Sequence, residues 1–140
     1  MTEPMTHADL EKANLALYAA FEEADIDALE ELWDDAEDIA CVHPGSPLLT
    51  GRRDVLRSWT ALLANSGYLQ FVLSGVEVRV EGEVAVVTCE ENILADLSAA
   101  HGLVGGTAVA TNVFRRRDGR WRLWIHHSSP VATAEADDGE

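Results

Sequence analysis

The stretch TAVATNVFRRRDGRWRLWIHHS, residues 107–128, decides the fold. Its two halves, 107–116 and 120–128, are rich in β-branched and aromatic residues, which favour strands. Asp118-Gly119 lies between them and is typical of a tight hairpin turn, because the central residues of such a turn need a positive φ. The sequence therefore predicts an antiparallel hairpin here.

Upstream of this hairpin, apolar residues recur at every second position, which indicates further strands. We expect one extended segment over 68–80 with a bulge at Ser74-Gly75, a turn at 81–83 and a long strand over 84–94. Residues 96–106 contain several glycines and are expected to form a loop.

The first half of the chain shows apolar residues at helical spacing instead. The pattern predicts helices over 6–23, 25–33 and 52–65, and a short strand over 38–43. Pro44 ends that strand, because proline has no N–H to donate to a β-ladder. Helices followed by an antiparallel meander indicate an α+β fold rather than α/β. Three helices cannot cover both faces of the sheet, so we expect the outer face to bury against a second copy in a homodimer.

Length and composition indicate how many domains the chain forms, and its net charge excludes some classes of partner. The chain has 140 residues and 47% apolar residues, which fits one packed domain, expected over 1–131 and followed by a disordered acidic tail over 132–140. Its formal net charge of −15 argues against a nucleic-acid partner and against an anionic membrane surface.

Cellular location is predicted from what the chain lacks. Residues 1–9 have no signal-peptide pattern, and no apolar run reaches the roughly 20 residues of a membrane span, so we expect a cytoplasmic protein. Cys41 and Cys89 lie in apolar runs without CxxC spacing and are expected to be buried free thiols.

Three groups of short strings carry a family resemblance. They are ADIDAL at 24–29 with LWDDA at 32–36, VHPG at 42–45 with TGR at 50–52, and TNVFRR at 111–116 with DGRWR at 118–122 and HHSSP at 126–130. Together they resemble the nuclear-transport-factor-two-like superfamily, which includes ketosteroid isomerases, scytalone-dehydratase-like enzymes and SnoaL-like polyketide cyclases. The resemblance implies a cone-shaped, cystatin-like α+β fold, a curved antiparallel sheet wrapped around about three N-terminal helices. It does not determine the reaction, because the fold hosts many functions.

The resemblance also implies where a site would lie. Ketosteroid isomerases place their catalytic aspartate at the end of the first strand, immediately before a proline, and His43 occupies that position here. Their oxyanion-stabilising aspartate corresponds to Asn112, and their oxyanion tyrosine maps near Leu17, one place from Tyr18. These departures argue against a straightforward steroid isomerase.

Strand alternation groups further candidates with these residues. If Asn112 faces inward, so does Phe114 on the same strand. Matching the hairpin at Asp118-Gly119 to the family implies that Trp124 and His126 on the last strand also face inward, and the polar face of the long strand adds Glu90 and Asn92. A single bulge would exchange Glu90 for Glu91 or His126 for His127.

These residues predict an acid–base site. Its expected catalytic residues are His43, Glu90, Asn112 and His126: histidine titrates near neutral pH, a carboxylate sets its tautomer, and an amide stabilises an oxyanion. The expected substrate-binding residues are Tyr18, Trp33, Trp59, Asn92, Phe114 and Trp124, which suit a small apolar or cyclic ligand. No cofactor motif or metal-ligand signature is present, so we expect neither a cofactor nor a metal.

Three functions remain open from the residues alone. The first is a cofactor-free isomerase, cyclase or dehydratase acting on a carbonyl compound. The second is a ligand-binding protein without catalysis, and the third is an association domain that oligomerises through its sheet. A purely structural role for the same side chains is a further alternative, because buried histidines pair with something in any fold and tryptophans at core spacing usually pack.

Overall fold

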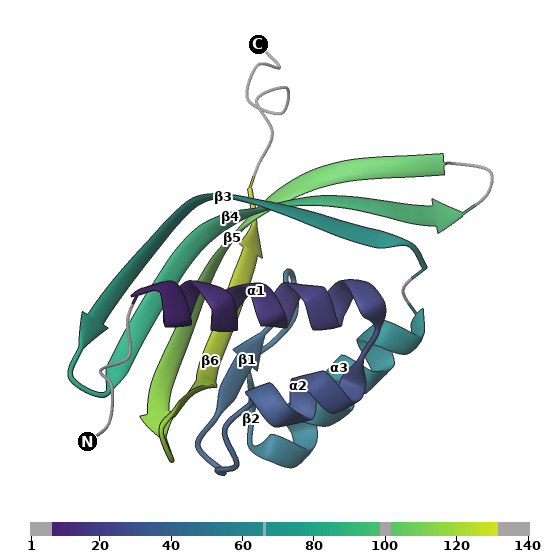
Figure 1. Cartoon of the computed structure of the whole chain (residues 1–140). Coiled ribbons are helices and arrows are strands. Elements are labelled where there is room, and N and C mark those ends of the chain that lie inside the picture. The colour runs from purple at the N-terminus through teal and green to yellow at the C-terminus, as the bar shows by residue number, and fades with distance from the viewer. Residues whose placement is uncertain (1–6, 66, 99–101, 132–140) are drawn as a thin grey trace.

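The computed structural model describes residues 7–65, 67–98 and 102–131, which form three helices and one curved sheet (Figure 1). The elements are α1 His7–Glu23, α2 Ile26–Leu32, β1 Ala40–Val42, β2 Leu49–Thr50, α3 Arg52–Asn65, β3 Leu69–Glu81, β4 Val84–Ser98, β5 Gly102–Arg117 and β6 Arg120–Pro130. The sheet order is β2-β1-β6-β5-β4-β3, with β1 parallel to β6 and the other neighbours antiparallel. The predicted α+β fold is confirmed.

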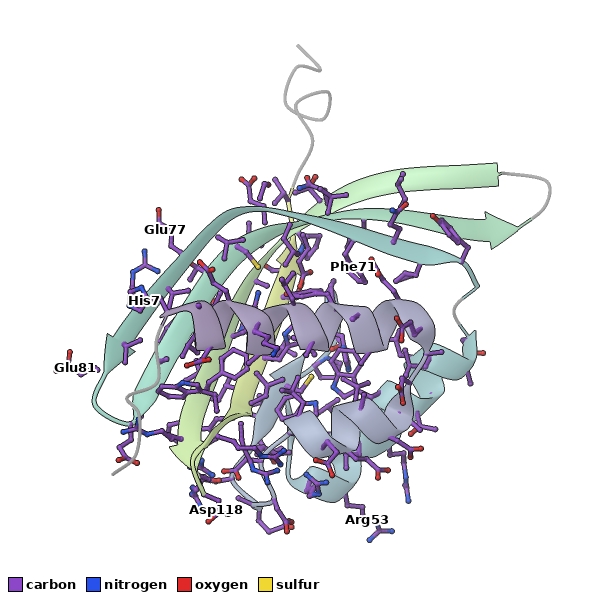
Figure 2. All side chains as sticks on the ribbon, in the orientation of Figure 1. His7, Arg53, Phe71, Glu77, Glu81 and Asp118 are labelled. Carbon is purple, nitrogen blue, oxygen red and sulfur yellow. The ribbon has the colours of Figure 1, made fainter. Side chains whose placement is uncertain are left out.

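All three helices lie on the concave side of the sheet. Strands β3, β4 and β5 arch over α1, while α2 and α3 close the lower end beside β1 and β2 (Figure 1). Phe71 points from β3 towards α1, whereas Glu77 and Glu81 on the same strand point away from the helices (Figure 2). The core therefore lies between the concave face and the helices, and it buries Trp33, Trp59 and Phe114 completely.

Local interactions explain where the elements begin and turn. The Asp25 side chain caps α2 by accepting a hydrogen bond from the Ala28 N–H at 3.1 Å. The predicted hairpin turn between β5 and β6 is confirmed, with φ of 54° at Asp118 and 75° at Gly119. Arg52, at the start of α3, donates to the carbonyls of Trp33 and Asp34 at 3.1 and 3.0 Å and so ties α3 to the end of α2.

The loop predicted over 96–106 is wrong for most of its length. Strand β4 continues to Ser98 and β5 begins at Gly102, so the two strands form one long hairpin. Gly105 and Gly106 pair with Leu94 and Ile93 inside this ladder. Glycine carries no side chain to show alternation, which is why the pattern did not reveal a strand. The two-residue strand β2 was also not predicted, and the proposed tail over 132–140 lies outside the described residues.

Two irregularities determine which residues face inward. The predicted bulge in β3 is confirmed: the register with β4 shifts between Ser74 and Glu77. A second shift lies between β5 and β6, where Val113 pairs with Ile125 and the next residue, Phe114, pairs with Leu123. Trp124 is therefore an extra residue in β6, and it reverses the alternation along that strand.

Candidate functional site

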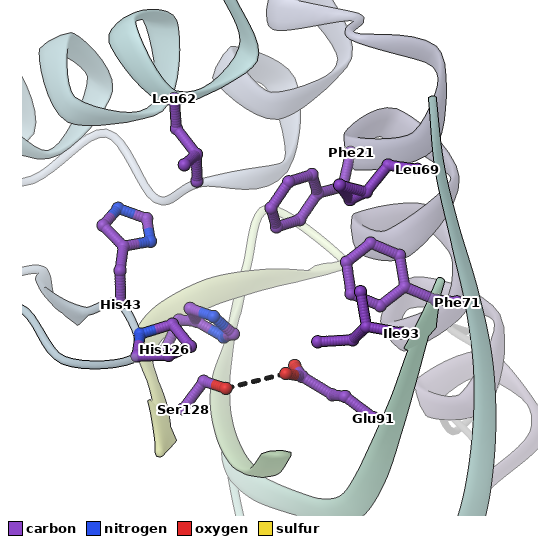
Figure 3. Close-up of a pocket in the computed structure, with 10 residues that line it drawn as sticks. Phe21, His43, Leu62, Leu69, Phe71, Glu91, Ile93, His126 and Ser128 are labelled. Atoms are coloured by element: carbon purple, nitrogen blue, oxygen red, sulfur yellow. Dashed lines mark hydrogen bonds between the residues drawn. The ribbon is translucent and has the colours of Figure 1, made fainter. Parts of the chain in front are cut away.

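A pocket of about 270 Å³ lies between α1, α3 and the concave face of the sheet (Figure 3). Its apolar wall comes from Phe21, Pro44, Leu62, Leu69, Phe71 and Ile93. Its polar lining comes from His43, Glu91, His126 and Ser128. Figure 3 shows these four side chains gathered on one side, opposite the phenylalanine rings. Such a division suits a compact apolar ligand with one polar end.

The carboxylate in the pocket belongs to Glu91, so the prediction that Glu90 faces inward is wrong. Glu91 is 3% exposed and accepts hydrogen bonds from the hydroxyls of Tyr18 at 2.5 Å and Ser128 at 2.7 Å. Glu90 is exposed on the outer face, where Ser74 donates to it at 2.8 Å.

Asn92, the residue after Glu91 on β4, also faces outward and is therefore not part of the site. Its amide donates to the Val72 carbonyl at 2.9 Å and to Ser74 at 3.0 Å, on the outer face. The other face of this strand, with Ala85, Val87, Cys89, Glu91 and Ile93, was expected to suit a dimer surface. Ala85, Val87 and Cys89 pack in the core instead. The inward side of β4 is the apolar side because α1 covers it.

Asn112 faces inward as predicted and lies at the centre of a buried hydrogen-bonded chain. Its Nδ2 donates to Asn14 at 2.8 Å and to the Tyr18 hydroxyl at 3.1 Å, and its Oδ1 lies 2.5 Å from Nδ1 of His126. Both amide protons are therefore used within the core, and Asn112 does not line the pocket. This geometry favours positioning of His126 over the oxyanion role expected from the sequence.

The directions of these hydrogen bonds determine which ring nitrogen of His126 carries the proton. They can be followed from Glu91 through Tyr18 and Asn112 to His126. A carboxylate only accepts, so Tyr18 donates its single proton to Glu91 and must accept from Asn112. The amide nitrogen of Asn112 then faces Tyr18, and its oxygen accepts a proton from Nδ1 of His126. Nε2 of His126 is left with a lone pair and has no hydrogen-bond partner among the described residues.

His43 is held in the opposite tautomer. The Ser58 hydroxyl donates to the Val55 carbonyl at 2.7 Å, so it accepts from Nε2–H of His43, 3.0 Å away. Nδ1 of His43 therefore carries the lone pair, and in Figure 3 this nitrogen points to the side of the ring where Leu62 and His126 lie. The ring packs edge-on against Trp59, with 4.7 Å between centroids.

Burial keeps both imidazoles neutral. It lowers the pKa of half-buried His43, and it lowers the pKa of His126 to about 3, with smaller contributions from the charges of His43 and His127. The ring centroids of His43 and His126 are 6.4 Å apart, so two open ring nitrogens serve one small pocket.

Burial and the charge of Glu91 raise the pKa of Tyr18 far above its usual value. Tyr18 therefore remains protonated at neutral pH and donates to Glu91.

The predicted substrate-binding residues do not line the pocket. Trp33, Trp59 and Phe114 are fully buried in the core, and Tyr18 lies behind Glu91. Trp124 is the extra residue of the β6 bulge; its ring lies 4.3 Å from the Arg115 guanidinium, and its Nε1 donates to the Asp38 carbonyl at 3.2 Å. His126 still faces inward, because the bulge reverses the alternation after Trp124.

The helix and strand residues of the apolar wall were missed, because each of them matches an ordinary core position in its own element. Phe21 and Leu62 lie on the apolar faces of α1 and α3, and Phe71 and Ile93 follow the alternation of their strands. Ser128 could have been found: it lies two residues from His126 on the same strand face.

Two other expectations concern absences. No cluster of three metal-ligating side chains was found among residues 7–65, 67–98 and 102–131. Within the same ranges, none of the helices has the length and hydropathy required to cross a membrane.

Cys41 and Cys89 are buried free thiols, as predicted, and burial raises the pKa of Cys41 to about 12.

Comparison with known proteins gives relatives of this fold. A candidate dehydratase of the NTF2-like family from Streptomyces avermitilis is 46% identical, with a TM-score of 0.83 over 90% of this chain and 96% of that one. A candidate association domain of calcium/calmodulin-dependent protein kinase type II from Thiobacillus denitrificans is 28% identical, with a TM-score of 0.77 over 87% of this chain and 94% of that one.

The curated F-box protein SKIP8 of Arabidopsis thaliana is 27% identical over 116 residues, which are 83% of this chain. The matched region is 47% of that plant protein, so the chain spans about half the length of this relative. The SnoaL-like domain family matches residues 10–133, and the chain therefore belongs to the SnoaL-like family within the NTF2-like superfamily.

Proposed function

We propose that this protein is a cofactor-free acid–base enzyme of the dehydratase or isomerase type, acting on a small, largely apolar hydroxy-carbonyl compound. The observation that carries the proposal is the pair of neutral imidazoles, His43 and His126, which line one pocket with 6.4 Å between their ring centroids. The Streptomyces avermitilis relative, described as a candidate dehydratase, supports the same class.

The two histidines would have different roles. A pKa of about 3 makes His126 a weak proton acceptor at neutral pH, because general bases work best when their pKa lies near the working pH. His43 is less buried and takes the role of base through Nδ1. His126 accepts a hydrogen bond from the substrate through Nε2 and orients it.

A dehydration would proceed as follows. Nδ1 of His43 removes a proton from the carbon next to the carbonyl, and the released electron pair forms a carbon–carbon double bond. The carbon–oxygen bond of the hydroxyl breaks, and the hydroxyl leaves as water with the proton from the His43 imidazolium. An isomerase would instead return that proton to a different carbon.

Proton exchange tests this proposal without knowledge of the natural substrate. Small cyclic hydroxy-ketones are incubated with the full chain in D₂O, and deuterium incorporation next to the carbonyl is followed by NMR. We expect catalysed exchange that His43→Ala slows by about 10²-fold or more, the usual contribution of a positioned base. His127→Ala is the matched control, because His127 is exposed on the outer side of β6. Unchanged exchange in both His43→Ala and His126→Ala would rule out the proposed reaction.

A second candidate function is association through the sheet. It is favoured by exposed apolar residues on the outer face, where Val72 is 57% and Val109 43% exposed, and where no described helix packs. The Thiobacillus denitrificans relative is described as a candidate association domain. In this proposal two copies pair through that face as a homodimer, which leaves the pocket accessible in each copy.

A further inference from the structure

The polar side of the pocket offers hydrogen-bond acceptors and no donor. Of the described side chains that line it, four are polar: His43, Glu91, His126 and Ser128. Ser128 donates its proton to Glu91, at 2.7 Å. Nε2–H of His43 is directed to Ser58, and Nδ1–H of His126 is directed to Asn112. The polar groups that still face the pocket are all acceptors: two ring nitrogens with lone pairs, one hydroxyl oxygen and one carboxylate.

The carboxylate also lacks a counter-charge. Every donor recorded to Glu91 is a neutral hydroxyl, and none of the ion pairs among the described residues includes Glu91. The described residues that line the pocket include no lysine or arginine. Buried charges in proteins are normally paired, so this carboxylate is suited to a positive or hydrogen-bond-donating group that arrives with the ligand.

We propose that the pocket selects its ligand by hydrogen-bond donors: the ligand is a compact apolar body that carries a hydroxyl or an ammonium group. The inference deepens the proposed function, whose pocket it uses, because it assigns recognition to the hydroxyl of the substrate and not to its carbonyl. A carbonyl oxygen finds no proton on this lining. A carboxylate or phosphate finds no proton either, and Glu91 repels it.

The size of the pocket limits the apolar body. A dry cavity of roughly 150 Å³ accommodates benzene. The volume of about 270 Å³ therefore has room for one six-membered ring with a short substituent. Phe21 and Phe71, whose centroids are 4.8 Å apart, form the wall against which such a ring would pack.

A series of probes with one ring and different polar groups tests the inference. The dissociation constants of cyclohexanol, cyclohexylammonium, cyclohexanone and cyclohexanecarboxylate are measured on the full chain at pH 7 by NMR titration. We expect at least one of the two donor probes to bind tenfold or more tightly than both the ketone and the carboxylate. Comparable binding of the ketone or the carboxylate would overturn the inference, as would a lack of binding by both donor probes at millimolar concentration.

Two matched variants test whether Glu91 causes the preference for hydrogen-bond donors. Glu91→Gln replaces the carboxylate by an amide that can donate, so we expect it to abolish the preference for cyclohexylammonium and to improve binding of the carboxylate probe. Glu90→Gln makes the same change on the outer face and should leave all four constants unchanged. Equal effects of the two variants would contradict the inference. If Glu91→Gln does not fold, the wild-type series decides alone.

These titrations are independent of the proton-exchange experiment. Donor selectivity without any catalysed exchange would remove the proposed reaction and leave this inference intact. Catalysed exchange by a protein that binds ketones as tightly as alcohols would overturn this inference and leave the proposed reaction intact.

Discussion

At the scale of single residues, Glu91 determines the proton positions of several neighbours. Its two oxygens accept from Tyr18 and Ser128, and the direction of the first bond sets the orientation of Asn112 and the tautomer of His126. Hydrogen bonds to a charged group contribute roughly 1.5–3 kcal/mol each, so the buried carboxylate depends on both hydroxyls.

Removing the Tyr18 hydroxyl should therefore destabilise the protein. In Tyr18→Phe, Glu91 loses one of its two donors and Asn112 loses an acceptor, so we expect a loss of about 2–4 kcal/mol in the free energy of unfolding. Tyr68→Phe is the control, because Tyr68 is exposed and its hydroxyl donates to the exposed Gln70 side chain. It should change stability by less than about 0.5 kcal/mol. Urea unfolding measures both, and equal effects would contradict the buried network.

His126 should make the protein sensitive to acid. An unfolded histidine titrates near pH 6.5, whereas burial lowers the pKa of His126 to about 3 in the folded state. Between these pH values the unfolded state binds more protons than the folded state, so the free energy of unfolding falls as the pH drops from about 6.5 towards 3. The contribution of neutral His126 to that free energy is fully present above pH 6.5. The charges of His43 and His127 also lower this pKa, Glu91 lines the same pocket, and Cys41 is the register partner of His126 on β1.

Urea unfolding at pH 7 and pH 5 measures this dependence. We expect His126→Gln to lose less stability than the wild type over this interval, because its side chain does not titrate. His127→Gln, the neighbour on the outer side, should retain the wild-type dependence. An identical pH dependence in all three proteins would show that His126 titrates normally.

At the scale of elements, the bulge in β6 joins the site to the scaffold. The extra residue, Trp124, lies 4.3 Å from the Arg115 guanidinium of β5. Arg115 in turn pairs with Asp34 at 2.5 Å and with Asp38 at 2.6 Å, in the segment between α2 and β1. This cluster fixes β1, and therefore the position of His43, against the bulged strand.

Arg115→Gln should be far more damaging than the same change at the next residue. The Asp34 side chain is 4% exposed. Without Arg115 it would keep the Asp35 N–H, which donates to it at 2.9 Å, and a longer ion pair with Arg117 at 3.7 Å, so we expect a loss of roughly 3 kcal/mol. Arg116→Gln removes a 3.5 Å pair with exposed Glu83 and should cost less than about 1 kcal/mol. Thermal or urea denaturation compares the two, and a small effect at Arg115 would show that the cluster contributes little.

At the scale of the whole molecule, the helices leave the convex face of the sheet uncovered (Figure 1). If two copies pair through this face, Val109→Asp should shift the protein from dimer to monomer, because a carboxylate would be buried without a partner at the interface. Leu15→Asp is the control, since Leu15 is 58% exposed on α1, away from that face. Light scattering coupled to size-exclusion chromatography measures both masses. A monomeric wild type would contradict the proposed association.

The architecture could be predicted from local sequence because its signals act over a few residues. The three helices follow from apolar spacing, the β5–β6 hairpin from Asp118-Gly119, and the break after β1 from Pro44. The inward positions of Asn112 and His126 were also predicted correctly, but both came from the family resemblance and not from local pattern.

Local sequence determined the three helices, β1 and the order of the meander, since turn residues and apolar spacing act within a single helix or hairpin. It did not determine β2 or the glycine-containing end of the β4–β5 hairpin. Only the tertiary structure decided that Glu91 and not Glu90 enters the pocket, that Trp124 lies at the β6 bulge and not among the described residues of the pocket lining, and that core-like residues such as Phe71 line a cavity. The physical reason is that a strand's facing is set by what packs against it and by bulges in its neighbours. Those contacts join residues far apart in the chain, such as Tyr18 and Glu91, whose hydrogen bond spans 73 positions.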